Sequence, residues 1–231
     1  MIQARRLSKL YGDFPALQNV DLDVAQGEFL AVLGRNGAGK STLLKLLATL
    51  ARPSMGTLSL GGMDASADSD SLRRRIGLLG HDTFLYDDLT AEENLLFYAG
   101  LYGIADQENA VRETLRLIGL EPFSKELVRN FSRGMRQRLT IGRLFLHDPD
   151  LLLLDEPFNG LDDRAVVLLN ELLRKAQARG KTILLCTHQL ELALRLADKL
   201  LILDRGKIAY LGPNQPDCEN EMRELYVRFA G

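Results

Sequence analysis

The sequence predicts an α/β protein with a mainly parallel sheet, an N-terminal antiparallel β subdomain and an inserted helical lobe. Three observations lead to this prediction. Short, continuous apolar runs alternate with amphipathic helical stretches, which is the pattern of a parallel sheet covered by helices. Residues 2 to 24 instead alternate between apolar and polar, as half-buried strands do. Residues 83 to 146 show helical periodicity with few strand signals.

The N-terminal part is expected to contain two strands, Ile2 to Leu10 and Leu17 to Val24, bounded by turn signals. The apolar run from Phe29 to Leu33 then predicts a buried strand. A glycine-rich loop follows it, and the leucines between Ser41 and Leu50 recur at helical spacing. This segment is therefore predicted to be strand, loop and helix.

Three more apolar runs begin at Leu151, Thr182 and Leu200, and each predicts a strand buried on both faces. Between these runs, Arg164 to Gly180 and Glu191 to Lys199 have the pattern of crossover helices. Together with the earlier buried strand, they predict one parallel sheet.

In the inserted lobe, a first helix is expected to begin with a capping box, with Thr90 as N-cap and Glu93 three residues later. A second helix has one apolar face, formed by Val111, Leu115 and Ile118. Gly119 is expected to end it. We therefore predict a single domain over residues 1–231: an α/β core with its β subdomain (1–82 and 147–212), the helical lobe (83–146) and a weakly patterned tail (213–231).

Composition narrows the functional classes. The chain has 29 Lys plus Arg against 31 Asp plus Glu, so it lacks the positive field of a general nucleic-acid binder, and we expect no nucleic-acid partner. Cys186 and Cys218 lie far apart without CxxC spacing, which fits a reducing compartment and neither a disulfide framework nor a zinc site. No signal-peptide pattern and no run of ~20 apolar residues is apparent.

Residues 34 to 41 fit the pattern G-x-x-x-x-G-K-[ST] between the predicted strand and helix. The loop consists of Gly34, Arg35, Asn36, Gly37, Ala38, Gly39, Lys40 and Ser41. Glycines let such a loop curl so that its N–H groups and the helix N-terminus surround a phosphate. Lys40 is expected to reach the β- and γ-phosphates, Ser41 to bind Mg²⁺, and Thr42 to bond near the α-phosphate.

A nucleoside-triphosphate site also needs a second metal ligand and a group that orients the attacking water. The run from Leu151 to Leu154 leads directly into Asp155 and Glu156, at the strand end where ligands collect in such sheets. We predict that Asp155 holds Mg²⁺ through water and that Glu156 is the general base.

With these motifs, nearly the whole chain resembles the ATP-binding subunits of ABC transporters, a family of P-loop NTPases. "GRNGAGKST" matches the family's Walker A loop and "LLLLDEP" its Walker B strand with the catalytic glutamate. "NGLD", ending at Asp162, matches the D-loop, and "LLCTH", ending at His188, matches the switch histidine that bonds the γ-phosphate. The resemblance implies ATP and Mg²⁺ as cofactors, and Lys40, Glu156 and His188 as catalytic residues.

"FSRGMRQRL" lies where the family has its LSGGQ signature; Ser132 and Gly134 are kept, whereas Arg133 and Met135 replace a glycine and the glutamine. In the family this segment contacts ATP bound to the other subunit. Elementary chemistry agrees with this role, because a serine at the start of a helix can bind an anion. The chain already has its own P-loop elsewhere, so this second anion receptor needs a second molecule. We therefore expect a second ATPase subunit, in a homodimer that encloses two ATP molecules.

Other nucleotide-binding positions of the family match this sequence to different degrees. Tyr11 matches the aromatic residue that stacks on adenine. His81 occupies the position of the Q-loop glutamine, so the metal contact of that glutamine is not carried over, although histidine can bond a water or the γ-phosphate. Ser132, Gly134 and Asp162 complete the predicted nucleotide-binding set.

The resemblance also implies an integral-membrane permease subunit that contacts residues 84–100, with this chain peripheral on the cytoplasmic face of the inner or plasma membrane. Phe84, Tyr86 and Phe97 are candidates for a groove that receives a short helix, and core packing of the lobe is the alternative.

For the cargo, the residues around the Q-loop and the signature resemble the ATPase of the haem exporter in cytochrome c maturation. Drug, antibiotic or polysaccharide exporters are the alternative. Two other classes stay open: a soluble ABC ATPase acting on DNA or ribosomes, and a nucleotide switch without hydrolysis, against which Glu156 argues.

Overall fold

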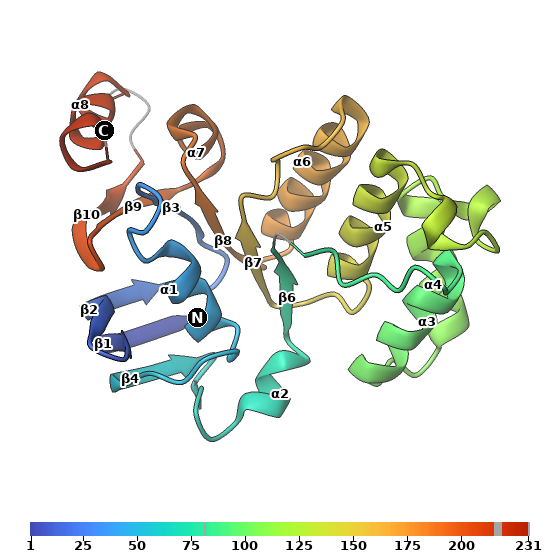
Figure 1. The fold of residues 1–231 in the computed structure, drawn as a ribbon, viewed down its shortest axis with the longest axis horizontal. Coiled ribbons are helices and arrows are strands. Elements are labelled where there is room, and N and C mark those ends of the chain that lie inside the picture. The colour runs from blue at the N-terminus through green and yellow to red at the C-terminus, as the bar shows by residue number, and fades with distance from the viewer. Residues whose placement is uncertain (81, 215–218, 231) are drawn as a thin grey trace.

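The computed structural model describes residues 1–80, 82–214 and 219–230, and these form two sheets and a helical lobe (Figure 1). The larger sheet has the strand order β10-β9-β3-β8-β7-β6. Its strands are β3 (Phe29–Leu33), β6 (Ile76–Leu79), β7 (Leu151–Asp155), β8 (Thr182–Thr187), β9 (Lys199–Asp204) and β10 (Lys207–Pro213). All neighbours are parallel except β10, which pairs antiparallel with β9. The predicted mainly parallel sheet is confirmed.

The smaller sheet is antiparallel, with the order β2-β1-β4-β5. It consists of β1 (Ile2–Tyr11), β2 (Phe14–Val24), β4 (Met55–Leu60) and β5 (Met63–Asp64). The strands β4, β5, β6 and β10 were not predicted from the sequence. They are short or contain glycine, and their strand geometry comes from pairing with stronger strands.

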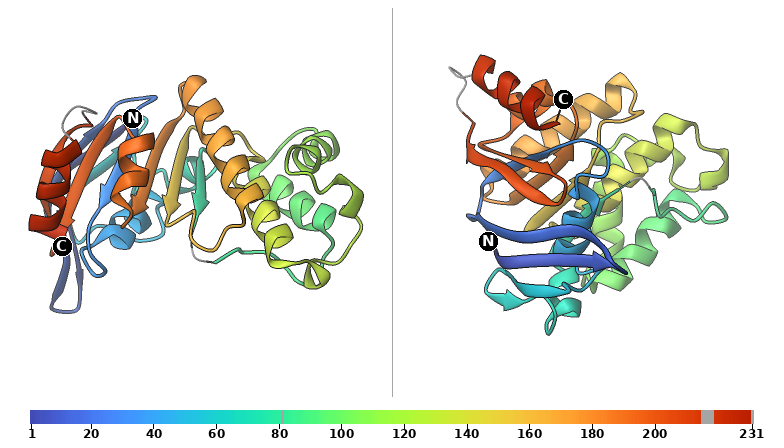
Figure 2. Two further views of the ribbon diagram at one scale, coloured as in Figure 1. Left: turned by 90° about the horizontal axis from the view of Figure 1, so that it is seen from above. Right: turned by 60° about the vertical axis from the view of Figure 1, so that its left-hand side comes forward.

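Helices cover both faces of the larger sheet (Figure 2). On one face, α1 (Lys40–Leu47) lies between the two sheets, and its leucines share a core with both. The short helix α2 (Ser69–Arg73) leads into β6. On the other face lie α6 (Asp163–Ala178), α7 (Leu190–Leu196) and α8 (Glu219–Ala230), whose apolar residues pack on β3, β7, β8 and β9.

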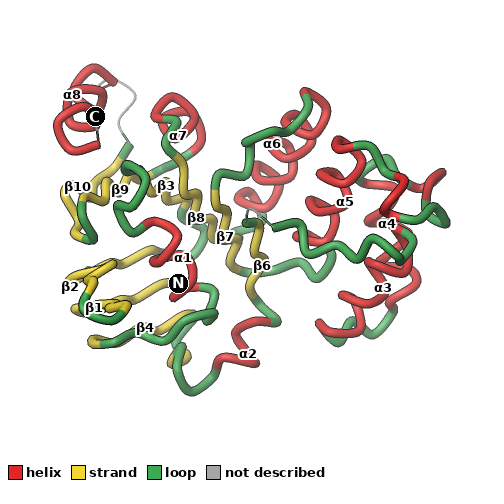
Figure 3. Tube along the Cα trace, viewed as in Figure 1, coloured by secondary structure: helices red, strands yellow, loops and turns green. Residues whose placement is uncertain are grey.

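The lobe contains α3 (Ala91–Tyr102), α4 (Gln107–Leu117) and α5 (Arg133–Phe145), and its elements are helices and loops (Figure 3). The capping box is confirmed: Thr90 Oγ1 accepts from the Glu93 N–H at 3.2 Å, and Glu93 Oε2 accepts from the Thr90 N–H at 2.8 Å. Gly119, with φ at 65°, follows the second helix. The lobe has its own apolar core, and α5 also packs on the large sheet through Ile141 and Leu144.

In the described parts of the chain, no helix is both long and apolar enough to cross a membrane.

Candidate functional site

The glycine loop after β3 has a backbone that only glycine adopts easily. Gly37 and Gly39 have φ of 83° and 109°. A Cβ on Gly39 would lie 2.7 Å from the carbonyl oxygen of Ala16, so the loop also packs too closely on β2 for any side chain. These two constraints hold the loop in a tight curve at the N-terminus of α1, where the helix dipole favours an anion.

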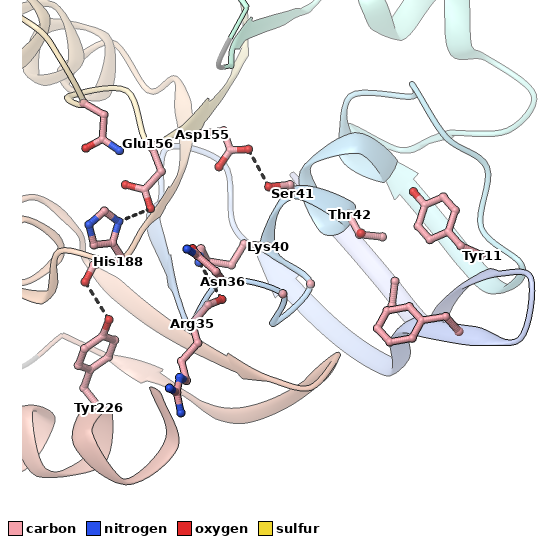
Figure 4. A pocket seen from close by; sticks show the side chains of 15 residues that line it. Tyr11, Arg35, Asn36, Lys40, Ser41, Thr42, Asp155, Glu156, His188 and Tyr226 are labelled. Atoms are coloured by element: carbon pink, nitrogen blue, oxygen red, sulfur yellow. Dashed lines mark hydrogen bonds and ion pairs between the residues drawn. The ribbon is translucent and has the colours of Figure 1, made fainter. Parts of the chain in front are cut away.

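Lys40 begins α1, and its side chain is folded over the same loop. Its Nζ donates to the carbonyl oxygens of Gly34 at 2.6 Å and Arg35 at 3.1 Å, and only 7% of the residue is exposed. The ammonium group is therefore held against the backbone of the loop, and Figure 4 shows the Lys40 side chain in the cavity. A phosphate bound there would offer Lys40 a charged partner in place of two neutral carbonyls.

Ser41 and Asp155 come together from opposite parts of the chain. Ser41 Oγ donates to Asp155 Oδ2 at 2.9 Å, and Asp155 is buried at the end of β7. The described residues contain no cluster of three or more His, Cys, Asp or Glu that would hold a metal by themselves. One hydroxyl and one carboxylate beside a phosphate loop fit Mg²⁺, which takes few protein oxygens and completes its shell with phosphates and water.

Glu156 follows Asp155 with φ at 49°, a conformation that turns it away from the strand direction. Its backbone N–H donates to Cys186 O at 2.8 Å. Its carboxylate accepts from Thr187 Oγ1 at 3.1 Å and from His188 Nδ1 at 2.7 Å. The ends of β7 and β8 thus fix the Glu156 carboxylate between a hydroxyl and an imidazole.

A cavity of about 940 Å³ joins these groups (Figure 4). On one side lie Tyr11 and Phe14, at the ends of β1 and β2, with Tyr11 48% exposed. On the other lie Glu156 and His188. The predicted site residues that line the cavity are Tyr11, Arg35, Asn36, Gly37, Gly39, Lys40, Ser41, Thr42, Asp155, Glu156 and His188. Gly34 and Ala38 belong to the same loop.

Outside the glycine loop, three predicted site residues among those described do not line this cavity. Ser132 is the N-cap of α5, and its hydroxyl accepts from the Met135 N–H at 3.3 Å. Gly134 lies under the carboxylate of Asp162, which leaves no space for a side chain. Asp162 is itself the N-cap of α6, accepting from the Ala165 N–H at 2.8 Å. His81 lies outside the described residues.

The arginines around Ser132 have partners on their own chain. Arg133 lies against Gly160, Arg136 pairs with Asp87 at 2.5 Å, and Arg138 donates to the carbonyl oxygens of Ile118 and Gly119 at 3.1 and 3.3 Å. These contacts tie the signature segment to its own lobe and to the loop after β7. They give these arginines structural roles within their own chain.

The residues near the site that were not singled out from the sequence include Thr187, Asn159 and Tyr226. Thr187 bonds Glu156, and Asn159 lines the cavity and accepts from Gln189 Nε2 at 3.3 Å. Thr187 lies in the motif "LLCTH" and Asn159 in "NGLD", so the sequence motifs could have pointed to both. Tyr226 also lines the cavity, but it comes from the weakly patterned tail and gave no signal.

Two pKa values near the site are raised. Burial is the larger cause for Tyr226, and the nearby charge of Glu156 adds to it. Burial also raises the pKa of the Cys186 thiol well above its usual value, followed by the charge of Asp155. Both groups therefore stay protonated at neutral pH, and Cys186 acts as a small buried apolar residue.

Comparison with known proteins places these features in a family. A family model described as "ABC transporter" matches residues 17–159. NatA, an ABC transporter ATP-binding protein of Bacillus subtilis, is 36% identical and covers 90% of this chain and 86% of its own. Nod factor export ATP-binding protein I of Cupriavidus metallidurans is 40% identical, covering 93% and 72%. The bacitracin transport ATP-binding protein BcrA of Bacillus licheniformis is 38% identical, covering 90% and 68%.

Solved structures agree. An ATP-binding subunit of an ABC transporter matches with a TM-score of 0.90 and 34% identity over 99% of both chains. A dimeric ATP-binding cassette in a post-hydrolysis state, bound to ADP and Pi, matches with a TM-score of 0.83 and 28% identity over 93% of this chain and 99% of its own. The predicted fold is confirmed. The relatives' names give no support to haem export; they fit the alternative of a drug or antibiotic exporter.

Proposed function

The chain belongs to the ABC transporter family as an ATP-binding ATPase subunit, and from this premise we propose that it drives an exporter, working as a dimer around two ATP molecules. The observation that carries the proposal is the 940 Å³ cavity, which unites a phosphate loop, a Ser41–Asp155 oxygen pair and a Glu156–His188 pair. Each of these supplies one requirement of phosphoryl transfer to water.

Binding of the triphosphate uses the loop and the residues beside it. The N–H groups of the loop and the N-terminus of α1 face the phosphates, and Lys40 exchanges its two carbonyl partners for phosphate oxygens. Ser41 and Asp155 would hold Mg²⁺, which neutralises phosphate charge when bound. The phosphate groups are thus oriented before any bond breaks.

Hydrolysis needs a base held at a fixed place. Glu156 is anchored by Thr187 and by His188 Nδ1, so its carboxylate keeps one orientation at the cavity wall. There it takes the proton of the attacking water. Because His188 uses Nδ1 for Glu156, Nε2 is the ring atom available to the γ-phosphate. The Glu156–His188 pair therefore connects the general base to the γ-phosphate.

The position of the signature segment supports the proposed dimer. Ser132 is exposed at the start of α5 and lies outside the cavity of its own chain. Its hydroxyl and the N-terminus of the 13-residue helix are suited to an anion on another molecule. Two copies related by a twofold axis would each supply the other's missing contacts. ATP then favours the closed dimer, and loss of phosphate releases it.

Replacement of Tyr11 by alanine is expected to raise the KM for ATP by about tenfold, with kcat little changed. A stacked base is worth ~1–3 kcal/mol, and adenine would lose this contact in both the ground and transition states. Steady-state ATPase kinetics measure the effect. Tyr11→Phe is the control, because it keeps the ring; if both variants behave alike, the ring does not bind adenine.

The surface proposed for the membrane partner lies on the lobe. Phe84, Tyr86 and Phe97 are 50%, 48% and 42% exposed, which favours a binding surface over core packing. Tyr86 and Phe97 pack edge to face, with ring centroids 5.0 Å apart. They stand next to a cavity of about 680 Å³, whose lining includes Tyr98, Leu101 and Tyr102 of α3. The lining is partly apolar and aromatic and partly charged, with Asp70, Arg73, Arg74 and Arg143. Docking of a permease helix through both apolar and polar contacts fits this site.

Arg143 gives this groove a positive floor. The residue is 5% exposed, and its guanidinium lies 5.5 Å from the Phe84 ring centroid and 5.2 Å from that of Tyr98. Burial lowers the pKa of Arg143, and the neighbouring Tyr102 and Tyr98 oppose this change. An arginine side chain keeps its charge in proteins. It lines the same cavity, so the proposed partner helix would meet a cation below the aromatic rings.

A charge placed in this groove should separate docking from hydrolysis. Leu101→Asp is expected to abolish recovery of the chain with membranes of its native host, while ATPase activity of the purified chain remains, because Leu101 lies on α3 and does not line the nucleotide cavity. Leu117→Asp, on α4, is the matched control: it is also exposed and does not line the groove. Equal membrane recovery of both variants would contradict docking in this groove, which adjoins residues 84–100.

For the cargo, the relatives named for bacitracin transport and daunorubicin resistance favour a drug or antibiotic exporter over haem export. The integral-membrane protein that co-purifies with the chain tests this choice, because the permease, not the ATPase, encloses the cargo. Recovery of a haem-export permease would reverse it. Absence of any membrane partner would favour the class that acts on DNA or ribosomes.

A further inference from the structure

The C-terminal helix α8 forms part of the nucleotide cavity. Tyr226 lines the cavity together with Glu156 and His188, although some 38 residues separate it from the nearer of the two. Figure 4 shows its side chain rising from the helix toward the His188 turn. None of the motifs in the sequence reaches this part of the chain.

Apolar packing and an ion pair fix α8 in place. Met222 is 6% exposed and belongs to the core cluster on the outer face of the large sheet. Arg223 pairs with Glu191 of α7 at 2.9 Å. Leu225, Tyr226 and Phe229 pack against the same cluster. The helix is therefore anchored both to the sheet and to the helix that follows His188.

The polar contact of Tyr226 goes to the residue that carries the switch imidazole. Its hydroxyl donates to the backbone carbonyl oxygen of His188 at 2.8 Å. The imidazole of the same residue bonds Glu156 at 2.7 Å. His188 itself follows the end of β8, and its side chain is 53% exposed, so little else encloses the imidazole. The backbone bond from Tyr226 thus limits how far this turn can move.

We propose that Tyr226 is a positioning residue for hydrolysis, whose hydroxyl holds the His188 turn so that the imidazole stays on Glu156 and beside the γ-phosphate. The proposal depends on the roles given above to His188 and Glu156. The hydroxyl acts through the backbone of His188. Loss of this bond lets the turn move and lowers the fraction of molecules with His188 in place.

Tyr226→Phe tests the proposal with little change in packing, because the ring is kept. We expect kcat to fall about fivefold, the equivalent of one neutral hydrogen bond of ~1 kcal/mol, while the KM for ATP and the melting temperature stay close to the parent values. Tyr210→Phe is the matched control. Its hydroxyl also faces a backbone carbonyl, that of Pro213 at 3.5 Å, but Tyr210 does not line the nucleotide cavity. An unchanged kcat, or a rise in KM alone, would overturn the proposal.

A double-mutant cycle shows whether Tyr226 acts through His188. His188→Ala should lower kcat strongly, and addition of Tyr226→Phe to that variant should then have no further effect. Additive losses would mean that the hydroxyl acts independently, for example on the nucleotide, and would overturn the positioning role. If His188→Ala alone leaves kcat unchanged, the assignment of the switch histidine fails instead. The two failures are thus distinguishable.

Discussion

Glu156→Gln is expected to lower ATP turnover by a factor of about 10²–10⁴, the range that a positioned general base contributes. Glutamine has almost the same shape, and its amide oxygen can still accept from His188 Nδ1 or Thr187 Oγ1. It cannot take a proton from water. ATP binding should persist, so the variant should accumulate as an ATP-bound dimer. Phosphate release measures the first effect, and light scattering with and without ATP measures the second.

The matched control is Glu171→Gln, the same change at an exposed position of α6 away from the cavity. It should leave both turnover and the monomer–dimer balance unaltered. Unaltered turnover in Glu156→Gln would show that another group activates the water. The cavity would then still bind ATP, but the Glu156–His188 pair would have a structural role.

Ser132→Asp is expected to reduce turnover by about 10²–10³, comparable to the loss of a key donor to transition-state charge. Aspartate is as good an N-cap as serine, so α5 and the melting temperature should be preserved. Its carboxylate, however, would face the γ-phosphate bound to the other subunit and repel it. ATP-dependent dimerisation should disappear together with activity. Ser132→Asn, a neutral N-cap, is the control and should retain far more of both.

Mixing two inactive variants tests completion of the site by the partner. In a hybrid of Lys40→Ala with Ser132→Asp, one site combines the intact loop of one chain with the intact signature of the other. Activity should therefore reappear on mixing, although each variant alone is inactive. If the mixture stays inactive while hybrids form, or if a chain shown to remain monomeric hydrolyses ATP at the full rate, the site is complete within one chain.

Much of the fold was visible in the sequence because its signals are local. The buried strands at Phe29–Leu33, Leu151–Asp155 and Thr182–Thr187 are continuous apolar runs, and the capping box at Thr90 is a spacing rule that the chain obeys by itself. The strand Ile76–Leu79 was missed because four residues carry too little pattern. It becomes a strand only by pairing with β7.

The candidate site likewise contains residues that local motifs predict and contacts that only the folded chain creates. The glycine loop and the pair Asp155 and Glu156 are contiguous motifs, whose residue types and spacing reveal their chemistry. The bonds from Thr187 and His188 to Glu156 join separate strands, so only their neighbourhood in the sheet creates them. The arginines of the signature segment are similar, since their partners Asp87 and Gly160 lie far away along the chain.

Residue patterns alone predict the phosphate loop, the acidic pair at the end of β7 and the buried strands β3, β7, β8 and β9, because each depends on residues a few positions apart. Tertiary structure alone decided that Ser41 meets Asp155, that Ser132 stays outside the cavity of its own chain, and that Tyr226 reaches the His188 turn. The physical reason is that hydrogen bonds act over about 3 Å in space, whereas sequence patterns report only neighbours along the backbone.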